Sequence, residues 1–76
     1  MKIVIVGDGK MGFALTERLS KDGHDVVVID RNARLLEECQ QSFDVMAVQG
    51  NGASMEVLME AGVESSDLLI AVTNSD

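Results

Sequence analysis

The stretch GDGKMG, residues 7–12, follows the apolar run KIVIV, residues 2–6, and precedes a helical pattern. Glycines at this spacing, between a strand and a helix, let the backbone pass close to a ligand. Gly7 allows the tight turn, Gly9 leaves room for a pyrophosphate, and Gly12 lets the helix pack closely on the sheet. The first helical turn also offers N–H groups to an anion. The stretch therefore predicts a phosphate-binding loop, with a plain strand–helix turn as the alternative interpretation.

Three further apolar runs resemble the first one and alternate with helical patterns. These runs are short, rich in β-branched residues and almost continuously apolar, which suits strands buried on both faces of a parallel sheet. Right-handed crossovers between them predict an α/β fold: half of a doubly wound nucleotide-binding fold, with a four-stranded parallel sheet of order 3-2-1-4 and helices on both faces. The predicted strands are residues 2–6, 25–29, 44–48 and 67–72, and the predicted helices are residues 10–21, 33–42 and 54–61.

Each predicted helix has apolar residues spaced to lie on one face, which we expect to pack on the sheet. Asn32 is the predicted N-cap of the second helix. Gly23 and Gly62 follow the first and third helices, where a residue of left-handed conformation ends many helices. The expected sheet-facing residues are Met11, Leu15 and Leu19 in the first helix, Leu36, Cys39 and Phe43 in the second, and Met55, Leu58 and Met59 in the third.

The composition predicts one cytoplasmic domain. Thirteen acidic and six basic side chains give a formal net charge of −7. A nucleic-acid binder needs a basic face, so we expect no nucleic-acid partner. The longest apolar runs are far shorter than a membrane span, and no signal-peptide pattern opens the chain. The single cysteine fits a reducing compartment.

Side chains with catalytic or metal-binding chemistry are sparse. His24 is the only histidine, and it falls in a helix–strand turn at the opposite end of the sheet from the glycines. Cys39 lies on the inner face of a predicted helix and is best explained as a small core residue. The sequence contains neither a Cys/His cluster with metal-ligand spacing nor a credible Ser/His/Asp arrangement. We therefore predict no catalytic residue and no metal site.

Asp30 ends the second predicted strand, eighteen residues after Gly12. An acidic residue at this distance can accept hydrogen bonds from the ribose hydroxyls of an adenosine. The same carboxylate would repel a 2′-phosphate. The predicted ligands are therefore NAD(H) or the adenine nucleotides ATP and ADP, with NADP disfavoured.

Other residues flank this predicted site. Lys10 either reaches a phosphate or is a solvated lysine at the start of a helix. Arg31 either lies over the adenine or binds a phosphate, although an exposed arginine at the start of a helix is the favoured interpretation. Asp8 points to solvent or bonds local N–H groups. The segment QGNGAS, residues 49–54, either borders the adenine or simply forms a turn and a helix cap. The segment VTNS, residues 72–75, either forms hydrogen bonds with ribose or phosphate or is a disordered chain end. The full predicted set of nucleotide-binding residues is Gly7, Asp8, Gly9, Lys10, Met11, Gly12, Asp30, Arg31, Asn51, Gly52, Ala53, Thr73 and Asn74.

Two long segments carry a family resemblance. MKIVIVGDGKMGFALTERLSKDGHDVVVIDRNARLLEE and VQGNGASMEVLMEAGVESSDLLIAVTNSD resemble the N-terminal nucleotide-binding lobe of the TrkA-type potassium-uptake regulators, the RCK or KTN domains. The resemblance covers essentially the whole chain. It departs where the family typically reads Gly-Asp-Ala-Thr, because this chain has Gly50, Asn51 and an extra Gly52. The resemblance implies a Rossmann-like fold and a non-enzymatic regulatory subunit that binds NAD(H), ATP or ADP.

The resemblance also implies partners. A membrane potassium transporter would receive the signal at the inner face of the cell membrane, through an oligomeric ring. A complete lobe of this family continues through further βα units, so we expect residues 1–76 to form a truncated Rossmann-like nucleotide-binding domain whose fourth strand is an apolar edge. Such an edge, or the neighbouring helix surface, predicts at least a dimer. The alternatives are the NAD-binding piece of an oxidoreductase and a degenerate fragment that binds nothing.

Overall fold

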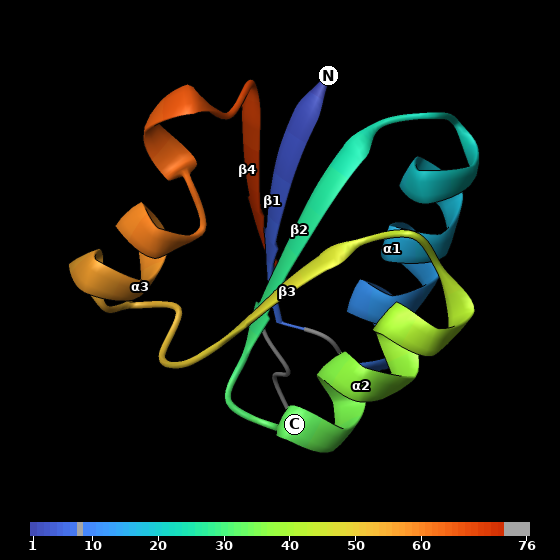
Figure 1. Ribbon diagram of the computed structural model, residues 1–76, viewed down its shortest axis with the longest axis horizontal. Helices are drawn as coiled ribbons and strands as arrows, with labels where there is room; N and C mark the ends of the chain where they lie inside the picture. Colours follow the sequence, from blue (N-terminus) through green and yellow to red (C-terminus); the bar gives the residue numbers. More distant parts are fainter. Residues whose placement is uncertain (8, 73–76) are drawn as a thin grey trace.

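The computed structural model describes residues 1–7 and 9–72, and strands alternate with helices along them (Figure 1). The elements are β1 (Lys2–Val6), α1 (Lys10–Lys21), β2 (Asp25–Asp30), α2 (Ala33–Ser42), β3 (Met46–Gln49), α3 (Met55–Glu60), the short 3₁₀ helix η1 (Val63–Ser65) and β4 (Leu68–Ala71). The predicted bounds of β1, α1 and α2 match these elements. The prediction began β3 two residues early and did not include η1.

The four strands form one parallel sheet in the order β3-β2-β1-β4, which confirms the predicted topology. In this register Val6 lies opposite both Ile29 and Ala71, and Asp30 lies opposite Gln49. The carboxyl ends of all four strands therefore meet at one edge of the sheet. In doubly wound folds, ligands bind outside this edge, where the strand order reverses.

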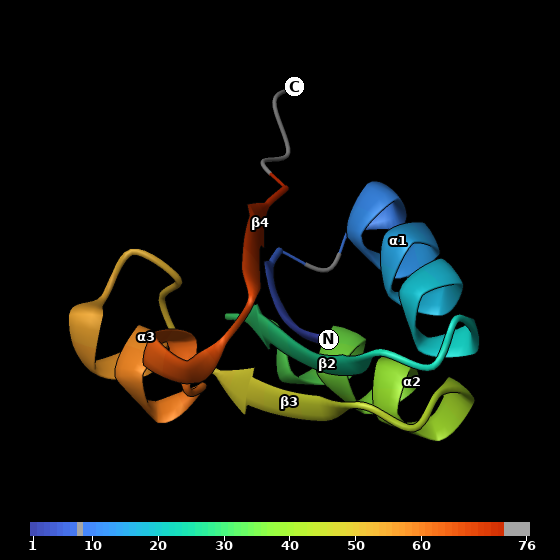
Figure 2. The same ribbon diagram turned by 90° about the horizontal axis from the view of Figure 1, so that it is seen from above.

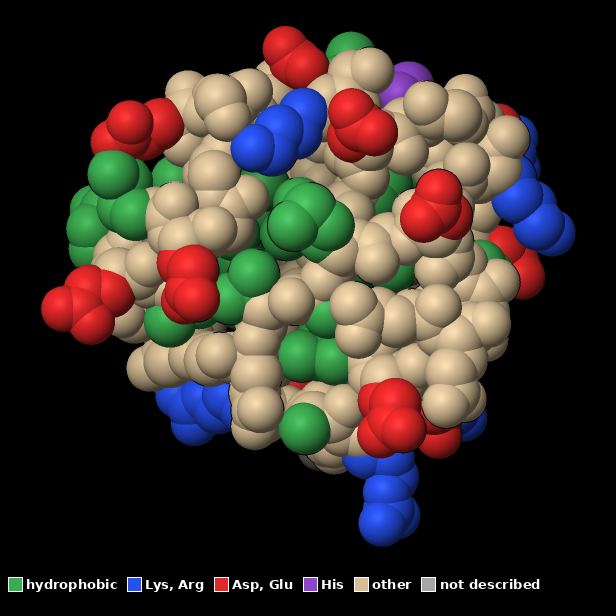
Figure 3. Space-filling view, viewed as in Figure 1, with side chains coloured by type: hydrophobic (Ala, Val, Ile, Leu, Met, Phe, Trp, Pro, Cys, Tyr) green, Lys and Arg blue, Asp and Glu red, His purple; other side chains and the backbone are tan. Residues whose placement is uncertain are grey.

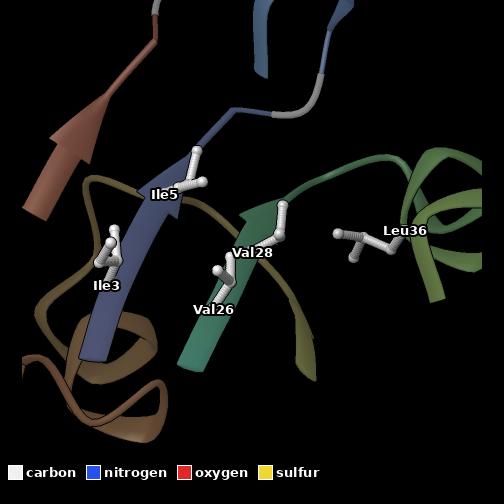
Figure 4. Close-up of a cluster of buried hydrophobic side chains, with 5 residues drawn as sticks. All are labelled: Ile3, Ile5, Val26, Val28 and Leu36. Carbon is white, nitrogen blue, oxygen red and sulfur yellow. The ribbon is translucent and has the colours of Figure 1, made fainter. Parts of the chain in front are cut away.

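Helices cover both faces of the sheet, as predicted. Figure 2 shows α1 and α2 on one side and α3 on the other. Alternate residues of the central strands divide between the two faces, because successive side chains of a strand point in opposite directions. The α1–α2 side contains the cluster drawn in Figure 4, and the α3 side contains a smaller one. The first cluster is Ile3, Ile5, Val26, Val28 and Leu36, and the second is Val4, Val27, Ile29 and Ala61.

The helix ends follow the predicted signals. The Asn32 side-chain oxygen accepts hydrogen bonds from the N–H groups of Arg34 (3.0 Å) and Leu35 (3.4 Å), which makes it the N-cap of α2. Gly23 and Gly62 have φ angles of +86° and +82°. Both glycines thus take the left-handed conformation that was expected of them after α1 and α3.

The predicted packing faces of α1 and α3 are partly wrong. Met11, Met55 and Met59 were expected to face the sheet, but 74%, 69% and 45% of their surfaces are exposed. In α1 the buried positions are Gly12 and Thr16, because the small glycine brings that side of the helix onto the strands. In α3, Leu58 packs against the core as predicted, but its other neighbours in the core are Val57 and the C-cap residue Ala61, which lie on the opposite side of the helix from the methionines.

Candidate nucleotide-binding site

The turn after β1 is tightly constrained at Gly7. This residue has a φ of +101°, and its N–H donates to the carbonyl of Ile29 over 2.8 Å. A Cβ at this position would collide with the carbonyl oxygen of Val72. Only glycine satisfies both the backbone angle and the close approach of the strand end. The predicted tight turn at Gly7 is therefore confirmed.

Helix α1 begins at Lys10, within the glycine stretch of residues 7–12. Gly9 is its N-cap in an extended conformation, and the Gly9 carbonyl accepts the Phe13 N–H over 2.8 Å. Gly9 has no side chain with which to cap this end of the helix, and the N–H groups of a first helical turn have no partner within the helix. Gly12 is buried, and its carbonyl accepts the Thr16 hydroxyl over 2.7 Å. The helix thus presents its N-terminus, with the positive end of its dipole, at the carboxyl edge of the sheet.

Asp30 ends β2 at the same edge and is half-buried. Its Oδ1 accepts the Asn32 N–H over 2.8 Å, and its carbonyl accepts the Gly50 N–H over 2.9 Å. The Gln49 side-chain amide donates to the Arg31 carbonyl over 3.3 Å. The turn between β2 and α2 is therefore fixed both by its own side chains and by the end of β3.

A groove of about 590 Å³ opens at this edge. Clefts of a few hundred cubic ångströms are typical of small-molecule sites. Four residues of the predicted site line this groove: Gly7, Asp30, Arg31 and Gly52. The other lining residues lie at or just after the ends of strands and were not in the predicted set. The lining residues are Val6, Gly7, Ile29, Asp30, Arg31, Gly50 and Gly52.

A second hollow, of about 480 Å³, lies between the beginnings of α1 and α2. Gly9 and Lys10 border this hollow together with Phe13, Leu35 and Glu38, and they do not line the groove that holds Asp30. The structure thus divides the predicted loop: Gly7 opens on the groove, and Gly9 on the neighbouring hollow. Met11 lies exposed on α1 and lines neither space.

The turn after β3 brings one of its three predicted residues to the groove. Gly52 lies so close to β1 that a Cβ would collide with the Val6 side chain. Asn51 is exposed, and its side-chain oxygen accepts the Ala53 N–H over 2.9 Å, so it stabilises the turn itself. Ala53 is also exposed and does not line the groove. A contact of Asn51 or Ala53 with adenine stays a prediction.

Three predicted site residues, Asp8, Thr73 and Asn74, lie outside the described residues. Within the described part of the chain, no three His, Cys, Asp or Glu residues are grouped so that they could hold a metal ion. None of the helices described has both the length and the apolar character that a membrane crossing requires.

Sequence reasoning did not identify Val6 or Ile29 as part of this edge, and it placed Gln49 and Gly50 there only as members of the segment 49–54, without assigning them a role. A signal was available for them: each residue ends a strand or directly follows one, and parallel strand ends converge at one edge.

The family model of the TrkA-N domain matches residues 3–76. The chain belongs to the TrkA-N domain family. Two relatives are similar to it over all 76 residues. The chain is 42% identical to the Trk system potassium uptake protein TrkA of Vibrio alginolyticus and 43% identical to that of Halomonas elongata. The chain spans 17% of the length of each of these TrkA proteins. The TrkA homolog of Methanothermobacter thermautotrophicus is 34% identical, and the chain spans 35% of it.

Solved structures have the same fold as this TrkA-N chain. The TrkA-N domain of the Escherichia coli inner membrane protein ybaL superposes with a TM-score of 0.84 at 31% identity, over 92% of this chain and 51% of that one. The Kef CTD of Shewanella denitrificans, solved in an AMP-bound form, also gives a TM-score of 0.84, over 99% of this chain and 44% of that one. Its sequence identity is 21%, so this second likeness bears on the fold alone.

Proposed function

We propose that the chain is the nucleotide-binding part of a regulatory subunit in a potassium uptake system. It binds NAD(H), ATP or ADP, catalyses no reaction, and passes its ligand state to a membrane potassium transporter. Membership of the TrkA-N family and the names of the TrkA relatives support the potassium system. The structural observation that carries the proposal is the groove at the carboxyl ends of β1, β2 and β3, where Gly7, Asp30 and Gly52 converge.

Asp30 is the residue to which we assign ribose recognition. It ends β2 at the groove, and a carboxylate in this position can accept hydrogen bonds from the ribose hydroxyls of an adenosine. A 2′-phosphate on the same ribose would bring a second negative charge to Asp30, so NADP(H) should bind worst. From the ribose, the ligand would extend past Gly7 towards the N-terminus of α1, where Gly9 would leave room for its phosphates.

Basic side chains support an anionic ligand at this edge. The chain carries a formal net charge of −7, which repels phosphates at long range. Of its six basic residues, Lys10 begins α1, and Arg31 and Arg34 lie at the beginning of α2, so half of them follow the carboxyl ends of strands. Figure 3 shows Lys and Arg side chains protruding at the lower end of the molecule, where Figure 1 places the entry to α2. Half of the basic side chains therefore lie near the edge where the groove opens, in an otherwise acidic chain.

Regulation would work through differential affinity. A nucleotide that binds one arrangement of subunits more tightly than another shifts their equilibrium, and by linkage shifts the state of the transporter. This mechanism needs at least a dimer, and it places the protein in the cytoplasm against the inner face of the membrane. The β4 edge, where Leu68 and Leu69 are 45% and 46% exposed, is the surface that we assign to self-association of the chain.

Calorimetric titration with NAD, NADH, NADPH, ATP and ADP tests the proposal. We expect micromolar binding of at least one of these nucleotides, with NADPH the weakest ligand. The Asp30→Ala variant should bind about 10- to 100-fold more weakly, because a hydrogen bond to a charged group contributes about 1.5–3 kcal/mol. Asp25→Ala is the matched control, since Asp25 is an exposed carboxylate at the other end of the same strand.

Two results would contradict the proposal. Absence of binding by all five nucleotides would reject the site as a whole. Equal losses of affinity in Asp30→Ala and Asp25→Ala would remove Asp30 from ribose recognition, because the two variants remove the same charge from the chain.

A further inference from the structure

We propose that Gln49 is a positioning residue for ribose recognition: its side-chain amide holds the peptide that orients the Asp30 carboxylate. The inference rests on the proposed function, since it names what controls the ribose acceptor in that site. Gln49 is the last residue of β3, and the sheet register places it opposite Asp30. It does not line the groove itself, so its effect on a ligand would be indirect.

The link passes through a single peptide group. The Gln49 Nε2 donates to the carbonyl oxygen of Arg31 over 3.3 Å. The N–H of the same peptide plane belongs to Asn32, and it donates to Asp30 Oδ1 over 2.8 Å. A peptide group is planar and rigid, so fixing its carbonyl also fixes the direction of its N–H. Gln49 therefore sets the direction of the N–H that Asp30 Oδ1 accepts.

The surroundings of this peptide give it little other support from the sheet. Arg31 and Asn32 are exposed, and they lie between the end of β2 and the first turn of α2. The Gly50 N–H holds the Asp30 carbonyl over 2.9 Å, but that carbonyl belongs to the Asp30–Arg31 peptide, so this bond does not fix the next peptide, Arg31–Asn32. Rotation of the Arg31–Asn32 peptide would turn its N–H away from the carboxylate. The bond from Gln49 opposes that rotation.

Two pairs of nucleotides measure this role: ATP against 2′-deoxy-ATP, and NADH against NADPH. The first pair differs only in the 2′-hydroxyl from which Asp30 is proposed to accept a hydrogen bond. The second pair differs in a 2′-phosphate that the Asp30 carboxylate would repel. The test variant is Gln49→Met, which keeps the length of the side chain and removes the donor. The matched control is Gln41→Met, an exposed glutamine at the far end of α2.

For the original protein we expect ATP to bind about tenfold more tightly than 2′-deoxy-ATP, the effect of one charge-assisted hydrogen bond. In Gln49→Met the affinity for ATP should fall about three- to tenfold, while the affinity for 2′-deoxy-ATP stays unchanged. The preference for NADH over NADPH should fall with it. Gln41→Met should behave as the original protein in all four titrations. A purely structural role of Gln49 would weaken both members of a pair equally.

Two outcomes would overturn the inference, and they are distinguishable. If Gln49→Met keeps both preferences, or loses affinity equally for both members of each pair, then Gln49 does not act through Asp30, while the proposed function stands. If the original protein itself prefers neither ATP nor NADH over its counterpart, or binds none of them, then Asp30 is not a ribose acceptor and the inference fails together with that part of the proposed function. Far-UV circular dichroism and urea midpoints verify that each variant is folded.

Discussion

Replacing Gly7 by alanine tests whether the glycine loop is needed for its backbone angle, for its close packing, or for both. Gly23 provides the comparison, because its φ of +86° is similar to the +101° of Gly7 while nothing lies within 4 Å of a Cβ added there. At Gly7 the added Cβ would meet the carbonyl oxygen of Val72. The two substitutions share the cost of a positive φ, and only the first adds a steric collision with backbone.

The magnitudes follow from these geometries. A residue with a Cβ in left-handed backbone costs about 1–2 kcal/mol, and the lower entropy of the unfolded alanine chain returns about 0.4–1 kcal/mol. Gly23→Ala should therefore lower the free energy of unfolding by at most about 1.6 kcal/mol. Gly7→Ala adds the cost of forcing an atom into a filled space, about 1–3 kcal/mol, for a total of about 1–4.6 kcal/mol.

Urea unfolding followed by far-UV circular dichroism measures both variants, since the chain contains neither tryptophan nor tyrosine as a fluorescent probe. Equal slopes of unfolding free energy against urea would show that the compactness of the states is unchanged. Losses that agree within about 0.5 kcal/mol for the two variants would refute the argument, because the approach of Val72 would then contribute nothing.

Four further predictions concern other parts of the chain. Asn32→Ala should lower the free energy of unfolding by about 1 kcal/mol, through the lost cap of α2, as measured by urea unfolding. Leu36→Ala should cost about 2–5 kcal/mol in the same assay, whereas Met59→Ala should change it by less than about 1 kcal/mol, and the reverse ranking would reject the assigned core. Gly9→Leu should abolish calorimetric binding of the nucleotides in a protein with unchanged circular dichroism, and retained binding would exclude a close approach of phosphate to this loop. Light scattering at tens of micromolar should find a dimer that Leu69→Lys converts to monomer; a monomeric original protein would contradict association through β4.

The topology was predictable because several independent patterns in the sequence agree. The continuous apolar runs around Val4 and Val27 are explained by strands that are covered on both faces, which only helices on both sides of the sheet provide. Asn32, Gly23 and Gly62 mark helix ends through local hydrogen bonds and backbone angles, which depend on little else in the molecule. Local chemistry and long-range pattern thus specify the same fold.

The helix faces were less predictable because hydrophobicity does not specify which apolar side is buried. Met55 and Met59 have the four-residue spacing of a packed face, yet Val57 and Ala61 have it too, and the shorter side chains are the ones against the sheet. Close packing determines which side of α3 is buried. A Cβ at Gly50 would lie 2.7 Å from the Val57 side chain, so the turn and the helix fit together at this point. Such complementarity involves residues from separate segments and leaves no periodic signal.

The site was predictable in part for the same reason. Gly7 and Asp30 carry motif signals, and the structure places both at one groove. The motif did not show that Gly9 and Lys10 border a separate hollow. Which space a loop residue borders depends on how neighbouring elements pack, and the spacing of the glycines does not contain that information. Gln49 carries no motif signal, because its partner is a main-chain carbonyl, and any residue type supplies one.

The division of the edge into two hollows limits how a nucleotide can lie there. The groove at Asp30 and the hollow at Lys10 share no lining residue: Gly7 borders the groove, and Gly9 borders the hollow. A ligand that uses both would have to extend from the Gly7 side to the Gly9 side. Under the proposed function the three glycines would have separate roles: Gly7 makes the turn, Gly9 would leave room for the phosphates, and Gly12 lets α1 pack closely on the sheet. A ribose bound by Asp30, with its carboxylate oriented through Gln49, would fix the point from which the ligand extends towards Gly9.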